Sequence, residues 1–263
     1  MPATSTPSAA VAELFHLLPG EPVFMAGSLA AAHAHDKADA WSDVDIFVPT
    51  EGLLFSTVKA LLMQGATPID YFDRVWHRWQ RYGLRRWHTN SMRLETLQGT
   101  EVNVVFKLVD GHPTTSLSQV LESFDFGLLA VGWDLETRTY RDLRPYLFPG
   151  MDIDGPLPLM PNKRDNWRQG FVSQYNGLRE GLRFLKYTDY GYDMSLVTDD
   201  LTTGYRLAAS YHEGNHDVQK QALAEIYHAL ADAIEDQDHA QLTELYKAID
   251  YDSPMTEILE RLE

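Results

Sequence analysis

The chain has 263 residues, with 22 Lys and Arg against 38 Asp and Glu, so its formal net charge is −16. A hydrophobic content of 44% with 23% charged residues excludes wholesale disorder, and the acidic balance argues against broad non-specific binding to nucleic acid. There are no cysteines, which excludes disulfides, thiolate zinc sites and a cysteine nucleophile.

Hydrophobic periodicity divides the chain into a first part of mixed helices and strands and a second part of helices alone. In the first part we expect helices at 8–18, 29–34, 53–63, 71–84 and 117–122, and strands at 23–26, 44–48 and 101–108. The apolar segment 124–131 fits either a strand or a helix.

In the second part an apolar stripe from Trp167 to Leu185 predicts one long helix. Further helices are expected at 201–211, 218–234, 241–249 and 254–262. The segment 145–161 contains five prolines and is the expected domain boundary. It separates an α/β domain at 1–150 from a helical domain at 151–263.

Two short motifs in the first part carry chemical information. Gly27 and Ser28 follow a buried strand, and Asp43 and Asp45 lie at i and i+2 on the next one. Period two puts both carboxylates on one face of that strand, where they repel each other unless a cation lies between them. Mg²⁺ prefers such oxygen ligands, and backbone N–H groups before a helix attract phosphate. The alternative is an acidic strand end after an ordinary tight turn.

This pattern resembles the nucleotidyltransferase superfamily, which has the DNA polymerase β-like fold. Gly27, Ser28, Asp43 and Asp45 carry the resemblance, which covers about residues 20–130, with a spacer of 14 residues between Ser28 and Asp43. The segment 122–126, Glu-Ser-Phe-Asp-Phe, is similar to uncharacterised viral and phage-type members. The resemblance implies an α+β fold, with a mixed-sheet nucleotidyltransferase core followed by an all-helical C-terminal domain.

The activity that the resemblance implies is transfer of an NMP from an NTP to an acceptor hydroxyl, with release of pyrophosphate. Asp43 and Asp45 would hold two Mg²⁺ or Mn²⁺ ions, and Gly27 and Ser28 would hold the β- and γ-phosphates. The acceptor is left open among an RNA, a small molecule and a protein side chain. Arg179 and Arg183, four residues apart on a helix, are candidates for contacts to the triphosphate.

The family expects a third acid on a neighbouring strand, where this chain has Asn103, a poor metal ligand. Asp125 is the favoured substitute, as a metal ligand and a catalytic residue. Glu101 is the other candidate, and we expect it to face the other way unless the strand begins with a bulge. If neither serves, the protein is a non-catalytic nucleotide- or protein-binding member of the same fold.

Two further features suggest other roles. Arg74, Arg78, Arg81 and Arg85 form one basic helical face with interleaved aromatics, which suits phosphate and base stacking or a solvated surface. His212 and His216 match the His-Glu-x-x-His pattern of zinc hydrolases, but Gly214-Asn215 between them predicts a turn. No Lys or Arg precedes Lys37, and no apolar run approaches the roughly 18 residues that span a bilayer. We therefore expect a cytoplasmic protein with no membrane partner.

Overall fold

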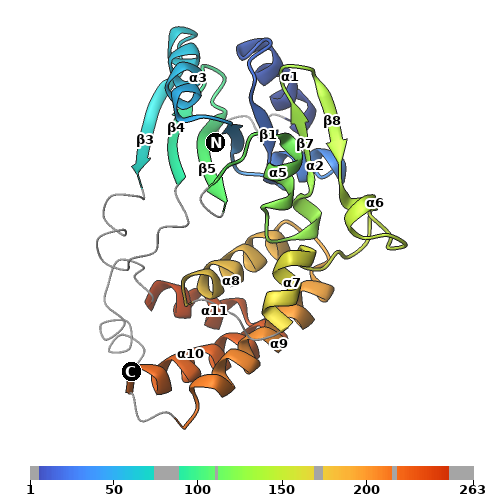
Figure 1. The fold of residues 1–263 in the computed structure, drawn as a ribbon, viewed down its shortest axis with the longest axis vertical. Helices are drawn as coiled ribbons and strands as arrows, with labels where there is room; N and C mark the ends of the chain where they lie inside the picture. Colours follow the sequence, from blue (N-terminus) through green and yellow to red (C-terminus); the bar gives the residue numbers. More distant parts are fainter. Residues whose placement is uncertain (1–5, 74–88, 110–111, 169–173, 215–217, 249–263) are drawn as a thin grey trace. The chain divides into compact units, whose positions relative to one another are not determined.

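The computed structural model describes residues 6–73, 89–109, 112–168, 174–214 and 218–248 (Figure 1). The chain separates into two compact units. The first unit comprises Met1–Phe124 and Leu128–Pro149, and the second comprises Asp125–Gly127 and Gly150–Glu263.

The first unit is built around a mixed β-sheet. Its elements in chain order are α1 (Pro7–Leu17), β1 (Phe24–Ala26), α2 (Ser28–Ala34), β2 (Val44–Val48), α3 (Glu51–Met63), β3 (Thr67–Asp73), β4 (Thr89–Glu95), β5 (Glu101–Val109), β6 (His112–Pro113), α5 (Leu117–Glu122), β7 (Val131–Asp134), β8 (Thr139–Asp142) and α6 (Arg144–Leu147). The strand order is β3-β4-β5-β2-β1-β7-β8, with β6 beside β5. Strands β2 and β5 are parallel and the other pairs are antiparallel, which confirms the α+β class.

Register and packing assign the two faces of the central strands. Met25 of β1 pairs with Ile46 and Trp133, and His33 of α2 contacts the Trp133 ring, so α2 covers that face. Ala26 pairs with Asp45 and Gly132 on the opposite face, where α5 packs against β1 and β7. Because side chains alternate along a strand, Val44, Ile46 and Val48 are fully buried while Asp45 projects to the α5 face.

The sequence prediction was wrong over one segment of the first unit. We expected a helix from 71 to 84, but residues 71–73 belong to β3, which pairs with β4 in antiparallel register. β3 and β4 were not predicted as strands. The remainder of the predicted helix lies outside the described residues. Strand pairing depends on partners distant along the chain, and local periodicity carries no signal for it.

The second unit contains the C-terminal helices. These are α7 (Pro161–Arg168), α8 (Gln174–Asp189), α9 (Ser195–His212), α10 (Val218–Glu235) and α11 (His239–Ala248). Helices α9 and α10 pack along their length, with Tyr205 and Tyr227 fully buried. Trp167 of α7 packs edge-on against Tyr205, at 4.9 Å between ring centroids. Gly204 admits this contact, because a Cβ there would lie 2.3 Å from the Trp167 ring.

The two units do not divide the chain at a single point. The chain passes from the first unit to the second at Pro149–Gly150, inside the proline-rich segment. Residues 125–127 also belong to the second unit, although they lie earlier in the chain. Phe126 forms a β-bridge with Leu159, and Gly127 N–H donates to the Pro158 carbonyl at 2.9 Å. These backbone bonds join residues 125–127 to residues 158–159, which precede α7. Gly127 is also the first residue of the 3-10 turn η1 (Gly127–Leu129).

Candidate functional site

Gly27 and Asp45 meet where β1 ends and α2 begins. Gly27 has φ +91° and ψ −150°, a conformation that residues with a side chain rarely adopt. A Cβ on Gly27 would lie 2.5 Å from Asp45 Oδ2. Glycine is therefore required here because the Asp45 carboxylate sits against the backbone turn.

Asp43 lies directly before β2 and is partly exposed, as Asp45 is. Its Oδ1 accepts a hydrogen bond from the Ser42 hydroxyl at 2.7 Å. Ser28, the first residue of α2, is buried, and its hydroxyl approaches the Asp43 backbone carbonyl at 3.5 Å. The sequence assigned Ser28 to phosphate binding, and the structure gives it a contact that anchors the Asp43 backbone.

Asn103 occupies the position expected for a third acid. It is the register partner of Asp45 across the parallel β2–β5 pair, and its Nδ2 donates to Asp45 Oδ1 at 2.9 Å. Its own Oδ1 is buried and accepts no hydrogen bond from the described residues. Sequence reasoning dismissed Asn103 as a poor ligand and missed its role as a donor. The matched alternation of the two strands is the signal that could have found it.

Glu101 lies on the same face of β5 as Asn103, whereas we expected it to face the other way. The β5–β4 register runs without a shift from Glu101 to Lys107, so positions 101 and 103 share one face. The expectation was wrong because residues two apart on a regular strand point the same way. Glu101 accepts a hydrogen bond from Arg93 Nε at 2.8 Å and forms an ion pair with that guanidinium.

Asp125 belongs to the second unit, whereas Asp43 and Asp45 belong to the first. Its side chain is 9% exposed and forms ion pairs with Arg183 and with Lys163, the latter at 3.5 Å between Nζ and Oδ1. Its backbone carbonyl accepts from Met160 N–H at 2.8 Å. Asp125 thus pairs with two cations of its own unit, and its assignment as a metal ligand stays a prediction.

The remaining candidates are the arginines proposed to contact phosphate and the histidines proposed to bind zinc. Arg183 lies on α8 and pairs with Asp125, whereas the side chain of Arg179 lies outside the described residues, as do Arg74, Arg78, Arg81, Arg85 and His216. Helix α9 ends at His212, Glu213 is extended and Gly214 has φ +70°. The continuous helix that a His-Glu-x-x-His zinc site needs is therefore not formed, and the expected turn begins at Glu213.

The donor set at Gly27 suits a hard divalent cation. Two carboxylates two residues apart are oxygen ligands of the kind that Mg²⁺ prefers. Within the described ranges, no group of three or more His, Asp or Glu side chains is assembled as a metal site. The residues present thus fit one cation anchored by an aspartate pair.

The chain was compared with protein-family models and with curated proteins. No protein-family model matches the chain, and no curated protein matches its sequence. In the part of the chain that the structure describes, none of the helices has the length and apolar character needed to cross a bilayer.

Proposed function

We propose that the protein is a Mg²⁺-dependent nucleotidyltransferase that transfers an NMP from an NTP to an acceptor hydroxyl. The observation that carries the proposal is the position of the Asp45 carboxylate. It lies against the Gly27 turn, between a strand and a helix, with Asp43 two residues before it. Asp45 and Gly27 come from separate segments of the chain, and the Asp45 carboxylate lies on the α5 face of the sheet.

Each residue has a distinct part in this proposal. Asp43 and Asp45 anchor the metal, which would neutralise phosphate charge and activate the attacking hydroxyl. Asn103 holds Asp45 Oδ1 through its amide, and Ser42 holds Asp43 Oδ1 through its hydroxyl. Gly27 leaves room for the carboxylate that a side chain would displace. Helix α2 has seven residues, so its dipole adds little, and phosphate binding depends chiefly on the metal.

A second candidate, nucleotide binding without transfer, is favoured by the partners of the expected third acid. Position 103 is an amide that already donates to Asp45. Glu101 pairs with Arg93, and Asp125 pairs with two cations of the second unit. If neither carboxylate leaves its partner, the group that deprotonates the acceptor is missing, and the site retains Mg–NTP without reaction.

One experiment separates the two candidates. The protein is incubated with each α-³²P-labelled NTP, Mn²⁺ and a cell lysate, and label is sought in RNA, protein and small molecules. Binding of a non-hydrolysable NTP is measured in parallel by calorimetry, with and without Mn²⁺. Asp45→Asn, which keeps the shape of the side chain and removes the charge, is the control for both measurements.

The transfer proposal predicts a labelled product with the wild type and none with Asp45→Asn. Metal-dependent NTP binding without a labelled product supports the second candidate instead. If no NTP binds, or if binding is unaffected by Mn²⁺ and by Asp45→Asn, both proposals are wrong.

A further inference from the structure

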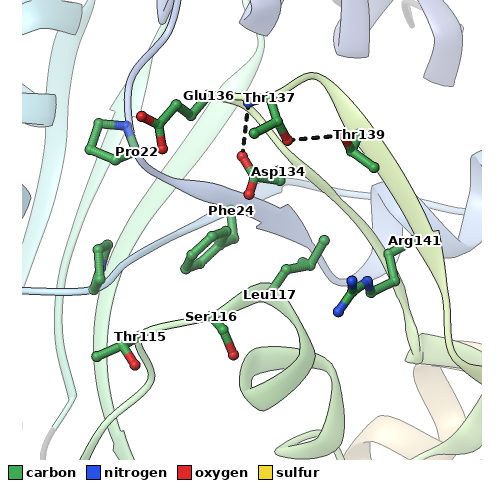
Figure 2. A pocket seen from close by; sticks show the side chains of 11 residues that line it. Pro22, Phe24, Thr115, Ser116, Leu117, Asp134, Glu136, Thr137, Thr139 and Arg141 are labelled. Atoms are coloured by element: carbon green, nitrogen blue, oxygen red, sulfur yellow. Dashed lines mark hydrogen bonds between the residues drawn. The ribbon is translucent and has the colours of Figure 1, made fainter.

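A hollow lies on the first unit, at the end of the sheet where β1 begins and β7 leads into β8 (Figure 2). Its volume is about 440 Å³, within the range of small-molecule sites. Its apolar lining comes from the largely buried Phe24 and Leu117 and from Pro22 and Pro49. All of its lining residues belong to the first unit.

This hollow is separate from the aspartate site, although both lie on the same face of the sheet. Phe24 and Ala26 alternate to the same side of β1, and Ala26 is the register partner of Asp45. A Cβ on Gly132 would lie 3.1 Å from Leu117 Cδ1 and 3.3 Å from Ala26 Cβ. Leu117 therefore packs over Gly132 beside Ala26, and none of Gly27, Asp43 and Asp45 lines the hollow.

Acidic side chains lie along the β7–β8 edge of the hollow. Asp134 is the register partner of Phe24, and its carboxylate is directed to the β7–β8 turn at Thr137, while Glu136 points toward Pro22 (Figure 2). Asp134 Oδ1 accepts from Thr137 N–H at 3.0 Å, which fixes the carboxylate in the turn. Across the described residues, neither Asp134 nor Glu136 forms an ion pair.

The acidic side chains that line the hollow outnumber the basic ones. Arg141 is the lining cation, and its guanidinium donates to the Ser118 hydroxyl on α5. Two carboxylates against one guanidinium leave a net negative charge, and the chain's own −16 adds to the attraction for cations. Thr115, Thr137 and Thr139 supply hydroxyls around the same opening.

We infer that this hollow binds a small organic amine with an apolar or aromatic body. The ammonium group bonds to the carboxylates of Asp134 and Glu136, and the body packs on Phe24 and Leu117. The inference does not depend on the proposed nucleotidyl transfer, since no residue is shared between the two sites.

Phenethylamine is the probe, and 2-phenylethanol is its uncharged control of nearly the same shape. Binding of both is measured by calorimetry and by ¹H–¹⁵N NMR at low ionic strength. The test variant is Asp134→Asn with Glu136→Gln, in which the amide oxygen introduced at position 134 still accepts the turn hydrogen bond. Glu122→Gln removes one negative charge from an exposed acid on α5 that does not line the hollow, and it is the control for a change of charge elsewhere on the first unit.

We expect phenethylamine to bind the wild type at least about tenfold more tightly than 2-phenylethanol, because hydrogen bonds to charged groups are the stronger ones. The double variant should lose that difference, and Glu122→Gln should keep it. NMR shifts should centre on Phe24, Thr137 and Thr139. Equal affinity for the two probes, or amine binding that survives the double variant, overturns the inference. So does the absence of phenethylamine binding at millimolar concentration.

Discussion

Asn103 and Asp45 face each other across the parallel strands β5 and β2, and the amide donates to the carboxylate at 2.9 Å. The bond fixes the orientation of one carboxylate of the acidic pair. The other side of the same carboxylate is bounded by Gly27, whose Cα leaves no room for a methyl group. Asp45 is therefore confined from two directions by residues that carry no charge of their own.

The first prediction concerns Asn103→Leu, which keeps the side-chain volume and removes the amide. Without the donor, the Asp45 carboxylate gains rotational freedom. Metal binding must then order that carboxylate, and this entropic cost lowers the affinity for the metal. We expect Mn²⁺ affinity, measured by EPR, to fall about tenfold, since a hydrogen bond to a charged group contributes about 1.5–3 kcal/mol. Removing the buried Oδ1 offsets part of the loss in folding stability.

Asn162→Leu, at an exposed position of α7, is the control for that change. It should leave Mn²⁺ affinity as in the wild type. An Asn103→Leu protein that binds Mn²⁺ normally would show that Asp45 does not need the amide.

The second prediction concerns Gly27→Ala. The new Cβ would overlap Asp45 Oδ2 at 2.5 Å. The alanine would also have to adopt φ +91°, a backbone conformation that residues with a side chain rarely adopt. The strain costs about 1–3 kcal/mol of folding stability, and the overlap displaces the carboxylate. Mn²⁺ and Mg–NTP binding should therefore fall by more than the loss of stability explains.

Gly20→Ala separates the two effects of that change. Gly20 also has positive φ, +70°, but a Cβ there would meet no atom within 4 Å. Its alanine variant should be less stable in urea denaturation and should bind Mn²⁺ normally. If Gly27→Ala behaves in the same way as Gly20→Ala, Gly27 is only a turn residue.

The third prediction concerns the aspartates themselves. Asp43→Ala and Asp45→Ala should each abolish Mn²⁺ binding and transfer while the protein remains folded, because the repulsion between the carboxylates that each change removes offsets the lost hydrogen bond from Ser42 or Asn103. Asp39→Ala removes an exposed carboxylate from the same loop and is the control. Metal titration and thermal melting of the three variants give the comparison. Wild-type activity in both Asp43→Ala and Asp45→Ala would refute their role.

The elements around the candidate site were predictable from sequence because their signals are local. The alternation of Val44, Asp45 and Ile46 predicts a strand with an acidic side chain on one face. The observed strand β2 has the predicted bounds. The Gly-Ser pair after an apolar run correctly predicted the turn from β1 into α2. Each of these inferences needs only neighbouring residues.

The parts that failed depend on partners far along the chain. β3 pairs with β4 across residues 74–88, and nothing in the local pattern at Tyr71 specifies that pairing. The hydrogen bond from Asn103 to Asp45 and the ion pairs of Asp125 also depend on partners that no spacing rule supplies, and the metal-ligand assignment of Asp125 stays a prediction. Glu101 was misassigned for a simpler reason, since strand period two already placed it on the face of Asn103.

The last prediction tests what Asp125 does. If it were the third metal ligand, Asp125→Asn would spare Mg–NTP binding and remove transfer. Its surroundings predict a different result, because the carboxylate is 9% exposed and pairs with Arg183 and Lys163. Its loss removes the ion pairs that it forms with both cations, which should destabilise the helical unit by about 1.5–3 kcal/mol. Transfer should then fall only in proportion to the loss of folded protein.

A double-mutant cycle with Arg183→Met distinguishes these accounts. Arg183→Met should destabilise the protein, and adding it to Asp125→Asn should cost less than the sum of the two changes, because both remove the same ion pair. The free energy of unfolding is measured in urea, and transfer is assayed below the unfolding transition. A stable Asp125→Asn protein that binds Mg–NTP and transfers nothing would restore the metal-ligand assignment, since a purely structural role cannot separate binding from transfer.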